Sequence, residues 1–204
     1  MNKEIINRII SSVILIPLVL FFTIKGSWFF NFLVLVCLLI TSYEWHIMTK
    51  KKKYYYLGFI FLILSFLSAL FLRNNFIHDF ILVILICIFT DIGGFVFGKI
   101  FKGPKLTKIS PNKTYSGAIG SYFLSIVSVL LYVNYYGNYW CGSACPSENK
   151  LLIITLLIST ISQIGDLTIS FFKRKSKIKN TGKIIPGHGG LLDRIDGMLF
   201  AIPF

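Results

Sequence analysis

The chain has few acidic residues and no long polar stretch. Of its 204 residues, 8 are Asp or Glu, and all charged residues together make up only 14%. Hydrophobic residues make up 55%, which is more than a soluble domain can bury, whereas membrane-spanning helices expose such surface to lipid. Because no polar stretch is long enough to form a separate soluble domain, residues 1–204 are predicted to form a single integral membrane domain.

Cysteine is also scarce, with four residues in the whole chain. Cys37 and Cys87 lie in apolar runs, where a free cysteine packs as a small apolar side chain. Cys141 and Cys145 lie in a loop, and this spacing without His or further Cys is a weak set of metal ligands. A local disulfide and two free thiols both remain open for this pair, and we assign it no function.

Seven apolar runs divide the chain, and they predict an all-α polytopic bundle of about seven transmembrane helices. Several runs are close to the minimum of about 17–20 residues for a span. The first run lacks a small-residue cleavage site, and a second run follows at once, so we interpret it as a retained span. The runs cover residues 9–24, 28–48, 57–72, 76–98, 117–137, 151–172 and 191–204.

Lysine and arginine are distributed unevenly between the loops, and this bias predicts the orientation. If the N-terminus is cytoplasmic, seventeen of the 21 basic residues fall on the cytoplasmic side, three fall in the outer loops, and Arg194 lies at the start of the last apolar run. Cytoplasmic loops of membrane proteins carry such an excess. We therefore expect a multi-pass protein with a cytoplasmic N-terminus, and we separately assign it to a bacterial-type inner membrane. This bias and anionic lipid headgroups explain the net charge of +13 without a nucleic-acid partner.

Three of the eight acidic residues lie between residues 163 and 196, each at or inside a hydrophobic segment. A carboxylate in such a segment is costly unless it binds a cation or lines a wet cavity, so Asp166, Asp193 and Asp196 are functional candidates. The last two are three residues apart and share a helix face. Another helix face is predicted to carry Asp166, Ser170, Lys173 and Arg174, at i, i+4, i+7 and i+8.

The turn between these two predicted helices is rich in glycine. It reads Pro186-Gly187-His188-Gly189-Gly190, and glycines let the backbone approach a ligand closely. The helix that follows would point its first N–H groups back at the turn, where an anion can bind. Carboxylates for a divalent metal, cations for phosphates and a glycine turn before a helix together indicate phosphoryl or nucleotidyl transfer.

This stretch resembles the signature of the phosphatidate cytidylyltransferases, or CDP-diacylglycerol synthases. That signature runs Ser, two residues, Lys-Arg, four residues, Lys-Asp, then a small residue and Pro-x-His-Gly-Gly, ending in x-Asp-Arg-x-Asp. The chain departs from it at Asn180, which stands where the family has Asp. The matching positions are Ser170, Lys173, Arg174, Lys179, Gly182, Pro186, His188, Gly189, Gly190, Asp193, Arg194 and Asp196.

A second stretch, residues 91–117, resembles the same family. Asp91 follows a long apolar run and precedes glycines that allow close helix contact. A lysine-rich loop follows and ends in Ser-Pro-x-Lys-Thr, which includes Lys113 and Thr114. Ser116 stands where the family usually has Glu. We expect this loop to support the signature at residues 163–197 from the cytoplasmic side.

The resemblance implies an enzyme that transfers a cytidylyl group from CTP to phosphatidate and forms CDP-diacylglycerol and pyrophosphate for phospholipid synthesis. It implies Mg²⁺, with a second cation possible, bound by Asp166, Asp193 and Asp196. Lys173 and Arg174 are expected to hold phosphates. The further substrate-binding positions are Ser170, His188, Gly189, Gly190, Arg194, Asp91, Lys113 and Thr114. A structural role in the turn remains equally open for His188.

The sequence also allows two other functions. A CTP-dependent polyprenol kinase would need a similar metal-and-phosphate site, and an ion-coupled transporter could use Asp91 and Asp166. The expected partners are CTP, phosphatidate and membrane lipids, and the glycine-rich spans would permit a homodimer. Glu44 and His46 lie beside Tyr43 and Trp45. Because aromatic residues mark the headgroup region, we interpret both as interfacial.

Overall fold

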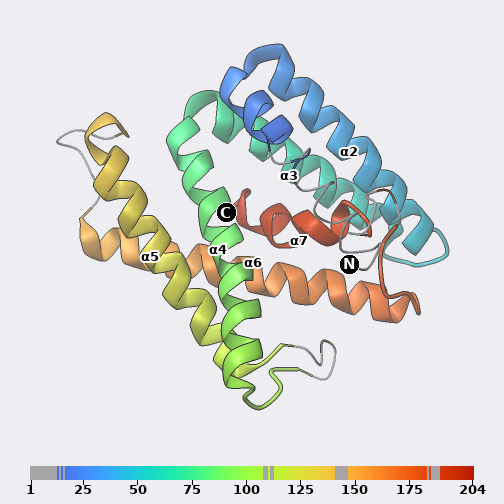
Figure 1. The fold of residues 1–204 in the computed structure, drawn as a ribbon. Coiled ribbons are helices and arrows are strands. Elements are labelled where there is room, and N and C mark those ends of the chain that lie inside the picture. Colours follow the sequence, from blue (N-terminus) through green and yellow to red (C-terminus); the bar gives the residue numbers. More distant parts are fainter. Residues whose placement is uncertain are drawn as a thin grey trace. The chain divides into compact units, whose positions relative to one another are not determined.

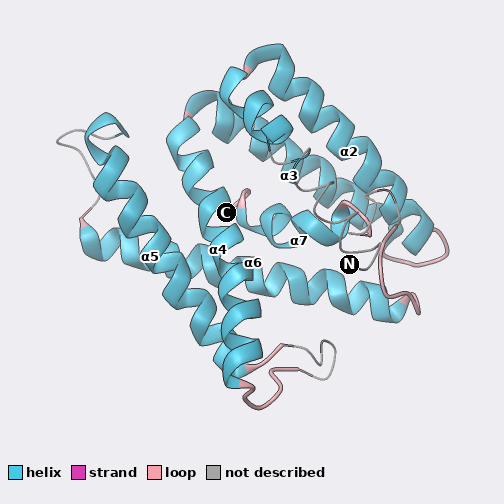
Figure 2. Cartoon of the chain, viewed as in Figure 1, coloured by secondary structure: helices cyan, strands magenta, loops and turns pink. Residues whose placement is uncertain are grey.

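The computed structural model describes residues 13, 15, 17–107, 110, 113–140, 147–182, 184 and 189–204. Helices joined by short loops make up these ranges, and no strand occurs in them (Figure 2). The all-α prediction is therefore confirmed. The loop with Cys141 and Cys145 lies outside the described residues, as do Pro186, Gly187 and His188 of the glycine turn.

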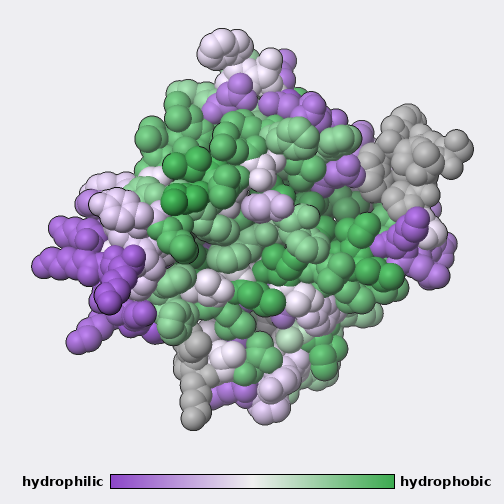
Figure 3. Space-filling view, turned by 180° about the vertical axis from the view of Figure 1, so that it is seen from behind, coloured by the Kyte–Doolittle hydropathy of each residue, from purple (hydrophilic) through white to green (hydrophobic). Residues whose placement is uncertain are grey.

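Within the described residues, five helices are long and apolar enough to cross a membrane, and they correspond to the second to sixth apolar runs (Figure 1). Large apolar side chains are exposed along them, for example Leu57 at 69% and Phe95 at 69%. Hydrophobic side chains accordingly cover much of the visible surface in Figure 3. Such surface suits contact with lipid rather than water. The helices are α2 (Ser27–Thr49), α3 (Tyr55–Asn75), α4 (Ile77–Phe101), α5 (Tyr115–Trp140) and α6 (Glu148–Lys175).

The first and last apolar runs differ from these five. Residues 17–25 are helical, but most of the rest of the first run lies outside the described ranges. The last run forms α7 (Leu192–Ala201), a helix of 10 residues. At 1.5 Å per residue α7 is about 15 Å long, half of a hydrocarbon core of about 30 Å. The described residues thus contain five long apolar helices, and the count of seven spans stays a prediction.

The chain divides into two compact units, which share helices α6 and α7. The first unit contains the chain up to Phe76 and the segment Phe172–Asp196. The second contains Ile77–Phe171 and Gly197–Ile202. The prediction of a single integral membrane domain is not tested by this division.

In the second unit, glycines allow α4 and α5 to pack so closely that their backbones are in contact. A Cβ on Gly93 would overlap the carbonyl oxygen of Gly120, and one on Gly117 would lie 2.7 Å from the carbonyl oxygen of Gly94. The Ser121 hydroxyl donates to the carbonyl oxygen of Thr90 across the same contact, at 2.6 Å. Small residues and hydroxyl groups are the usual means of packing helices in lipid. The expected role of the glycines after Asp91 is therefore confirmed.

Candidate active site

Helix α6 carries the first half of the signature, and its ends explain why it forms there. Glu148 lies in its first turn and three basic residues lie in its last turn, so both ends complement the helix dipole. The Ser170 hydroxyl donates to Asp166 Oδ1 at 3.3 Å, one turn away on the same face. The predicted helical spacing of Asp166, Ser170, Lys173 and Arg174 is therefore confirmed.

In the second unit, the lysine-rich loop and the signature meet at one ion pair. Lys113 Nζ contacts Asp166 Oδ2, and the two side chains are 26% and 27% exposed. Next to it, Thr114 Oγ1 accepts a hydrogen bond from the N–H of Gly117 at 3.1 Å, which caps the N-terminus of α5. Ser116 Oγ lies 3.0 Å from Thr114 Oγ1. The structure thus brings two predicted site residues together, from stretches more than fifty residues apart.

In the first unit, Asp193 binds three donors from the signature. Its Oδ1 accepts from Lys173 Nζ at 2.8 Å, and these side chains are 8% and 12% exposed. Its Oδ2 accepts from the N–H of Thr181 at 2.8 Å and from the N–H of Gly190 at 3.3 Å. One carboxylate therefore links the end of α6, the loop after it and the glycine turn.

Glu44 in α2 also contacts the signature segment, and its carboxylate is buried rather than snorkelling at the interface. Its side chain is 1% exposed, and it accepts three hydrogen bonds. Oε1 accepts from the N–H of Leu191 at 2.9 Å. Oε2 accepts from the N–H of Leu192 at 2.8 Å and from Thr181 Oγ1 at 3.0 Å. Two of its three partners are backbone groups about 147 residues later, so no side-chain pattern in the sequence indicates them.

The N-terminus of α7 binds an anion, as expected, but the anions are side chains of the protein itself. Glu44 accepts from Leu191 and Leu192, and Asp193 accepts from Gly190. Helix N-termini favour such partners because their first N–H groups have no intrahelical acceptor. These three N–H groups are therefore already bonded in this structure rather than open to a substrate phosphate.

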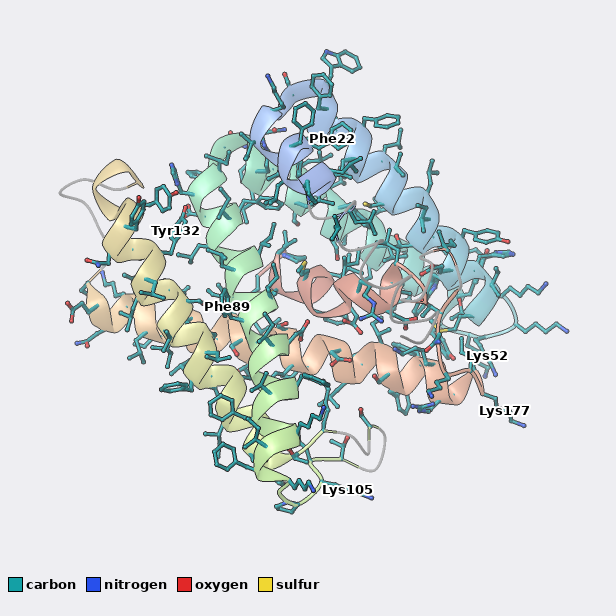
Figure 4. All side chains as sticks on the ribbon, in the orientation of Figure 1. Phe22, Lys52, Phe89, Lys105, Tyr132 and Lys177 are labelled. Carbon is teal, nitrogen blue, oxygen red and sulfur yellow. The ribbon has the colours of Figure 1, made fainter. Side chains whose placement is uncertain are left out.

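Aromatic residues support this arrangement at the end of α2 in the first unit. The Trp45 indole N–H donates to the carbonyl oxygen of Tyr55 at 3.0 Å, and its ring meets that of Phe172 at 5.4 Å between centroids. The Tyr54 ring lies 4.7 Å from that of Phe172. Lys175 Nζ lies 5.0 Å from the Tyr54 ring centroid, a cation–π contact. In Figure 4, by contrast, Lys52 and Lys177 extend away from the ribbon.

The other predicted site residues differ in how exposed they are. Arg174 and Arg194 are exposed, and so is Asp91 on α4. Gly189 has a φ of 91°, which favours glycine at this position. Asp196 is 6% exposed. His188 lies outside the described residues.

The predicted metal ligands offer the right kind of atom. Asp166, Asp193 and Asp196 present carboxylate oxygens, which Mg²⁺ prefers. Asp166 already faces an ammonium group, so its surroundings accommodate a cation. Among the described residues, no group of three or more His, Cys, Asp or Glu is gathered closely enough to hold a metal ion. Asp166 belongs to the second unit and the other two to the first, and their joint role as ligands stays a prediction.

Comparisons with known proteins agree with the signature. Residues 54–204 match the model of the Cytidylyltransferase family. A phosphatidate cytidylyltransferase of Rickettsia typhi is 36% identical over 214 residues, which is 99% of this chain and 90% of that protein. The protein of the same name from Rickettsia prowazekii is 37% identical over 210 residues, with the same coverage. One from Staphylococcus aureus is 40% identical over 135 residues, 64% of this chain and 48% of that protein. Glu44 precedes the segment that the family model matches.

Proposed function

Because the chain belongs to the cytidylyltransferase family, we propose that it transfers a cytidylyl group from CTP to phosphatidate. The products are CDP-diacylglycerol and pyrophosphate. The observation that carries this proposal is the similarity over 99% of the chain to proteins named phosphatidate cytidylyltransferase. The hydrogen-bonded arrangement of Lys173, Thr181, Gly190 and Asp193 supports it, because it gathers signature residues that are distant in sequence.

The reaction is a displacement at phosphorus. A phosphate oxygen of phosphatidate forms a bond to the α-phosphorus of CTP, and the bond from that phosphorus to the oxygen bridging the β-phosphate breaks. The lipid phosphate is ionised at pH 7, so no side chain has to remove a proton first. The chain's task is therefore to position two anionic substrates and to offset their charge.

Lys173 and Arg174 are the residues that we assign to the phosphates. Both stand at the end of α6, and Asp193 holds the Lys173 ammonium group in a fixed place. From there Lys173 would bind phosphate oxygens of CTP or the lipid and offset the charge that develops on pyrophosphate. Ser170, Lys113 and Thr114 are further binding candidates, since Lys113 and Ser170 both contact Asp166.

We propose Mg²⁺ as the metal, with Asp166, Asp193 and Asp196 as its ligands. This assignment is supported by their carboxylate chemistry and by their positions in the signature. When bound, Mg²⁺ would supply Lewis-acid stabilisation of the phosphate oxygens. The exposed fraction of Asp166, 27%, leaves this carboxylate accessible from solvent.

We further propose that the protein spans a bacterial inner membrane, with the N-terminus and the active site on the cytoplasmic side. The five long apolar helices in the described part of the chain support membrane spanning, and the excess of basic residues in alternate loops supports this orientation. The first apolar run and α7 would complete the seven predicted segments. The glycines of α4 and α5 already pack against each other in the second unit, so a homodimer would need another surface.

The function is tested by supplying the purified protein with CTP and Mg²⁺ and offering different acceptors. We expect turnover with phosphatidate and none with a polyprenol. Turnover with the polyprenol alone would indicate the kinase, and no turnover with either acceptor would favour a transporter. Lipid products separated by thin-layer chromatography give the result directly.

A further inference from the structure

Glu44 is a buried carboxylate that the mechanism above does not use. It is 1% exposed, and burying a charge is costly unless hydrogen bonds compensate for it. Here they do, since three donors converge on its two oxygens. All of these donors belong to the loop after α6 or to the start of α7. The contact therefore joins α2 to the loop after α6 and to the start of α7.

The surroundings of the carboxylate are shaped to receive it. A Cβ on Gly182 would lie 2.7 Å from Glu44 Oε1, and a Cβ on Gly190 would lie 2.7 Å from Oε2. Glycine at both positions leaves the space that the carboxylate occupies. Thr181, which donates its hydroxyl group to Glu44, is itself only 4% exposed.

Glu44 and Asp193 accept hydrogen bonds from the same two segments, the loop after α6 and the start of α7, but from different donor atoms. Thr181 donates its hydroxyl to Glu44 and its N–H to Asp193. The turn donates the N–H of Gly190 to Asp193 and those of Leu191 and Leu192 to Glu44. The two carboxylates thus hold the loop after α6 at Thr181 and the glycine turn at Gly190. Glu44 also holds the start of α7, the helix with Asp193 and Asp196.

We propose that Glu44 is a positioning residue of the active site. Its carboxylate holds the N-terminus of α7, and through it Asp193 and Asp196, in the arrangement that cytidylyl transfer requires. This inference rests on the proposed function for its effect on catalysis. The contacts themselves can be tested without any substrate.

The main variant is Glu44→Gln, which keeps the size of the side chain but replaces one acceptor oxygen with an NH₂ donor. That NH₂ group would then face either the Leu191 N–H or the Leu192 N–H and Thr181 hydroxyl. Thr181→Val removes one donor and keeps the shape, whereas Thr181→Ser keeps the hydroxyl group. Tyr43→Phe is the matched control, because Tyr43 is the adjacent residue and is 60% exposed.

Hydrogen exchange measures the contacts directly. In Glu44→Gln we expect the amides of residues 190–195 to exchange at least about tenfold faster than in the unaltered protein. Peptides from α2 and α3 should keep their rates, because the change is confined to the loop and the start of α7. Unchanged exchange at residues 190–195 would overturn the proposal.

Kinetics measure the consequence. We expect Glu44→Gln to lower kcat for CDP-diacylglycerol formation at least about tenfold, with a smaller change in the KM for CTP. Thr181→Val should lower kcat too, Thr181→Ser should retain more activity than Thr181→Val because it keeps the hydroxyl donor, and Tyr43→Phe should stay near normal. Normal kcat in Glu44→Gln despite faster exchange would contradict a positioning role. So would faster exchange throughout the first unit combined with a normal Thr181→Val enzyme, because that pattern indicates a contribution to stability alone.

The two measurements also separate this inference from the proposed function. If the unaltered protein makes no CDP-diacylglycerol, the proposed function fails, while the exchange rates still decide whether Glu44 holds α7. If Glu44→Gln does not fold, Thr181→Val and Thr181→Ser carry the test, since they alter one hydrogen bond to the same carboxylate.

Discussion

At the scale of single residues, the signature acids have different surroundings. Asp166 contacts one lysine and one hydroxyl group and is partly exposed. Asp193 is mostly buried and accepts from three N–H donors. A carboxylate has about four lone-pair positions, so Asp193 retains capacity for a metal ion. The two residues therefore contribute differently, each to the fold of its own unit.

Removing the charge of each signature acid should remove activity. We expect Asp166→Asn, Asp193→Asn and Asp196→Asn each to lower CDP-diacylglycerol formation at least about 100-fold, or roughly 2.7 kcal/mol of transition-state stabilisation. The reason is that Asn keeps the size but cannot hold the cation. Initial rates at saturating Mg²⁺ provide the measurement.

Lys177→Gln is the control for these variants, because Lys177 is exposed and is predicted to belong to the solvated basic run. It should lose little activity. Near-normal rates for both Asp193→Asn and Asp196→Asn would show that the metal site is wrong. The search for ligands would then move to Asp91.

The sequence predicted the acids of the signature but not Glu44, and the reason is physical. Asp166 is recognised from its neighbours, since Ser170 and Lys173 recur at helical spacing along the same chain segment. Glu44 has no such neighbours, because its partners are mainly backbone N–H groups that any residue provides. The only sequence signal was a carboxylate inside an apolar run, which is a functional candidate by default. The aromatic residues beside it favoured the interfacial interpretation instead.

At the scale of helices, the apolar runs predicted α2 to α6 well, whereas only part of the last run is helical and its role as a span stays a prediction. Its fourteen residues include Leu192–Ala201, which form a helix, but the chain folds into turns at residues 202 and 203. Hydropathy measures how apolar a run is, and it does not show where a short helix ends. The contact of α4 with α5 was predictable from their glycines, whereas the partner of each glycine was not.

The close approach of α4 and α5 should depend on Gly93. In Gly93→Ala, the added Cβ would overlap the backbone of Gly120, and the helices would have to move apart. We expect a loss of about 1–3 kcal/mol, the usual cost of overpacking. Thermal unfolding of the detergent-solubilised protein should therefore begin at a lower temperature.

Gly94→Ala is the matched control for this contact. Its Cβ would lie 3.0 Å from Ser121 Oγ, a side-chain atom, and no closer than 4.0 Å to the backbone of α5. Its unfolding temperature should fall less than that of Gly93→Ala, because only the Ser121 hydroxyl, which donates to the carbonyl oxygen of Thr90, has to shift. An equal loss in both variants would mean that glycine matters here for reasons other than helix contact.

At the scale of the whole molecule, the distribution of basic residues predicts which loops face the cytoplasm. Single cysteines at Lys52 and Asn138, in a background whose four native cysteines are replaced by Ser, should label from opposite sides of the membrane. Position 52 lies in the loop between α2 and α3, and position 138 lies near the end of α5. A membrane-impermeant maleimide applied to intact cells should label position 138 and not position 52. Labelling of position 52 from outside would reverse the orientation.

The chemistry itself is tested most directly by following the two ends of the CTP triphosphate. The purified protein receives Mg²⁺, phosphatidate and CTP labelled with ³²P at either the α- or the γ-phosphate. Cytidylyl transfer places the α-label in the lipid extract as CDP-diacylglycerol and releases the γ-label in water as pyrophosphate. We predict this outcome, and we predict its loss in Asp166→Asn. Recovery of the γ-label in the lipid, with the α-label left in water, would identify a kinase and contradict the proposed function.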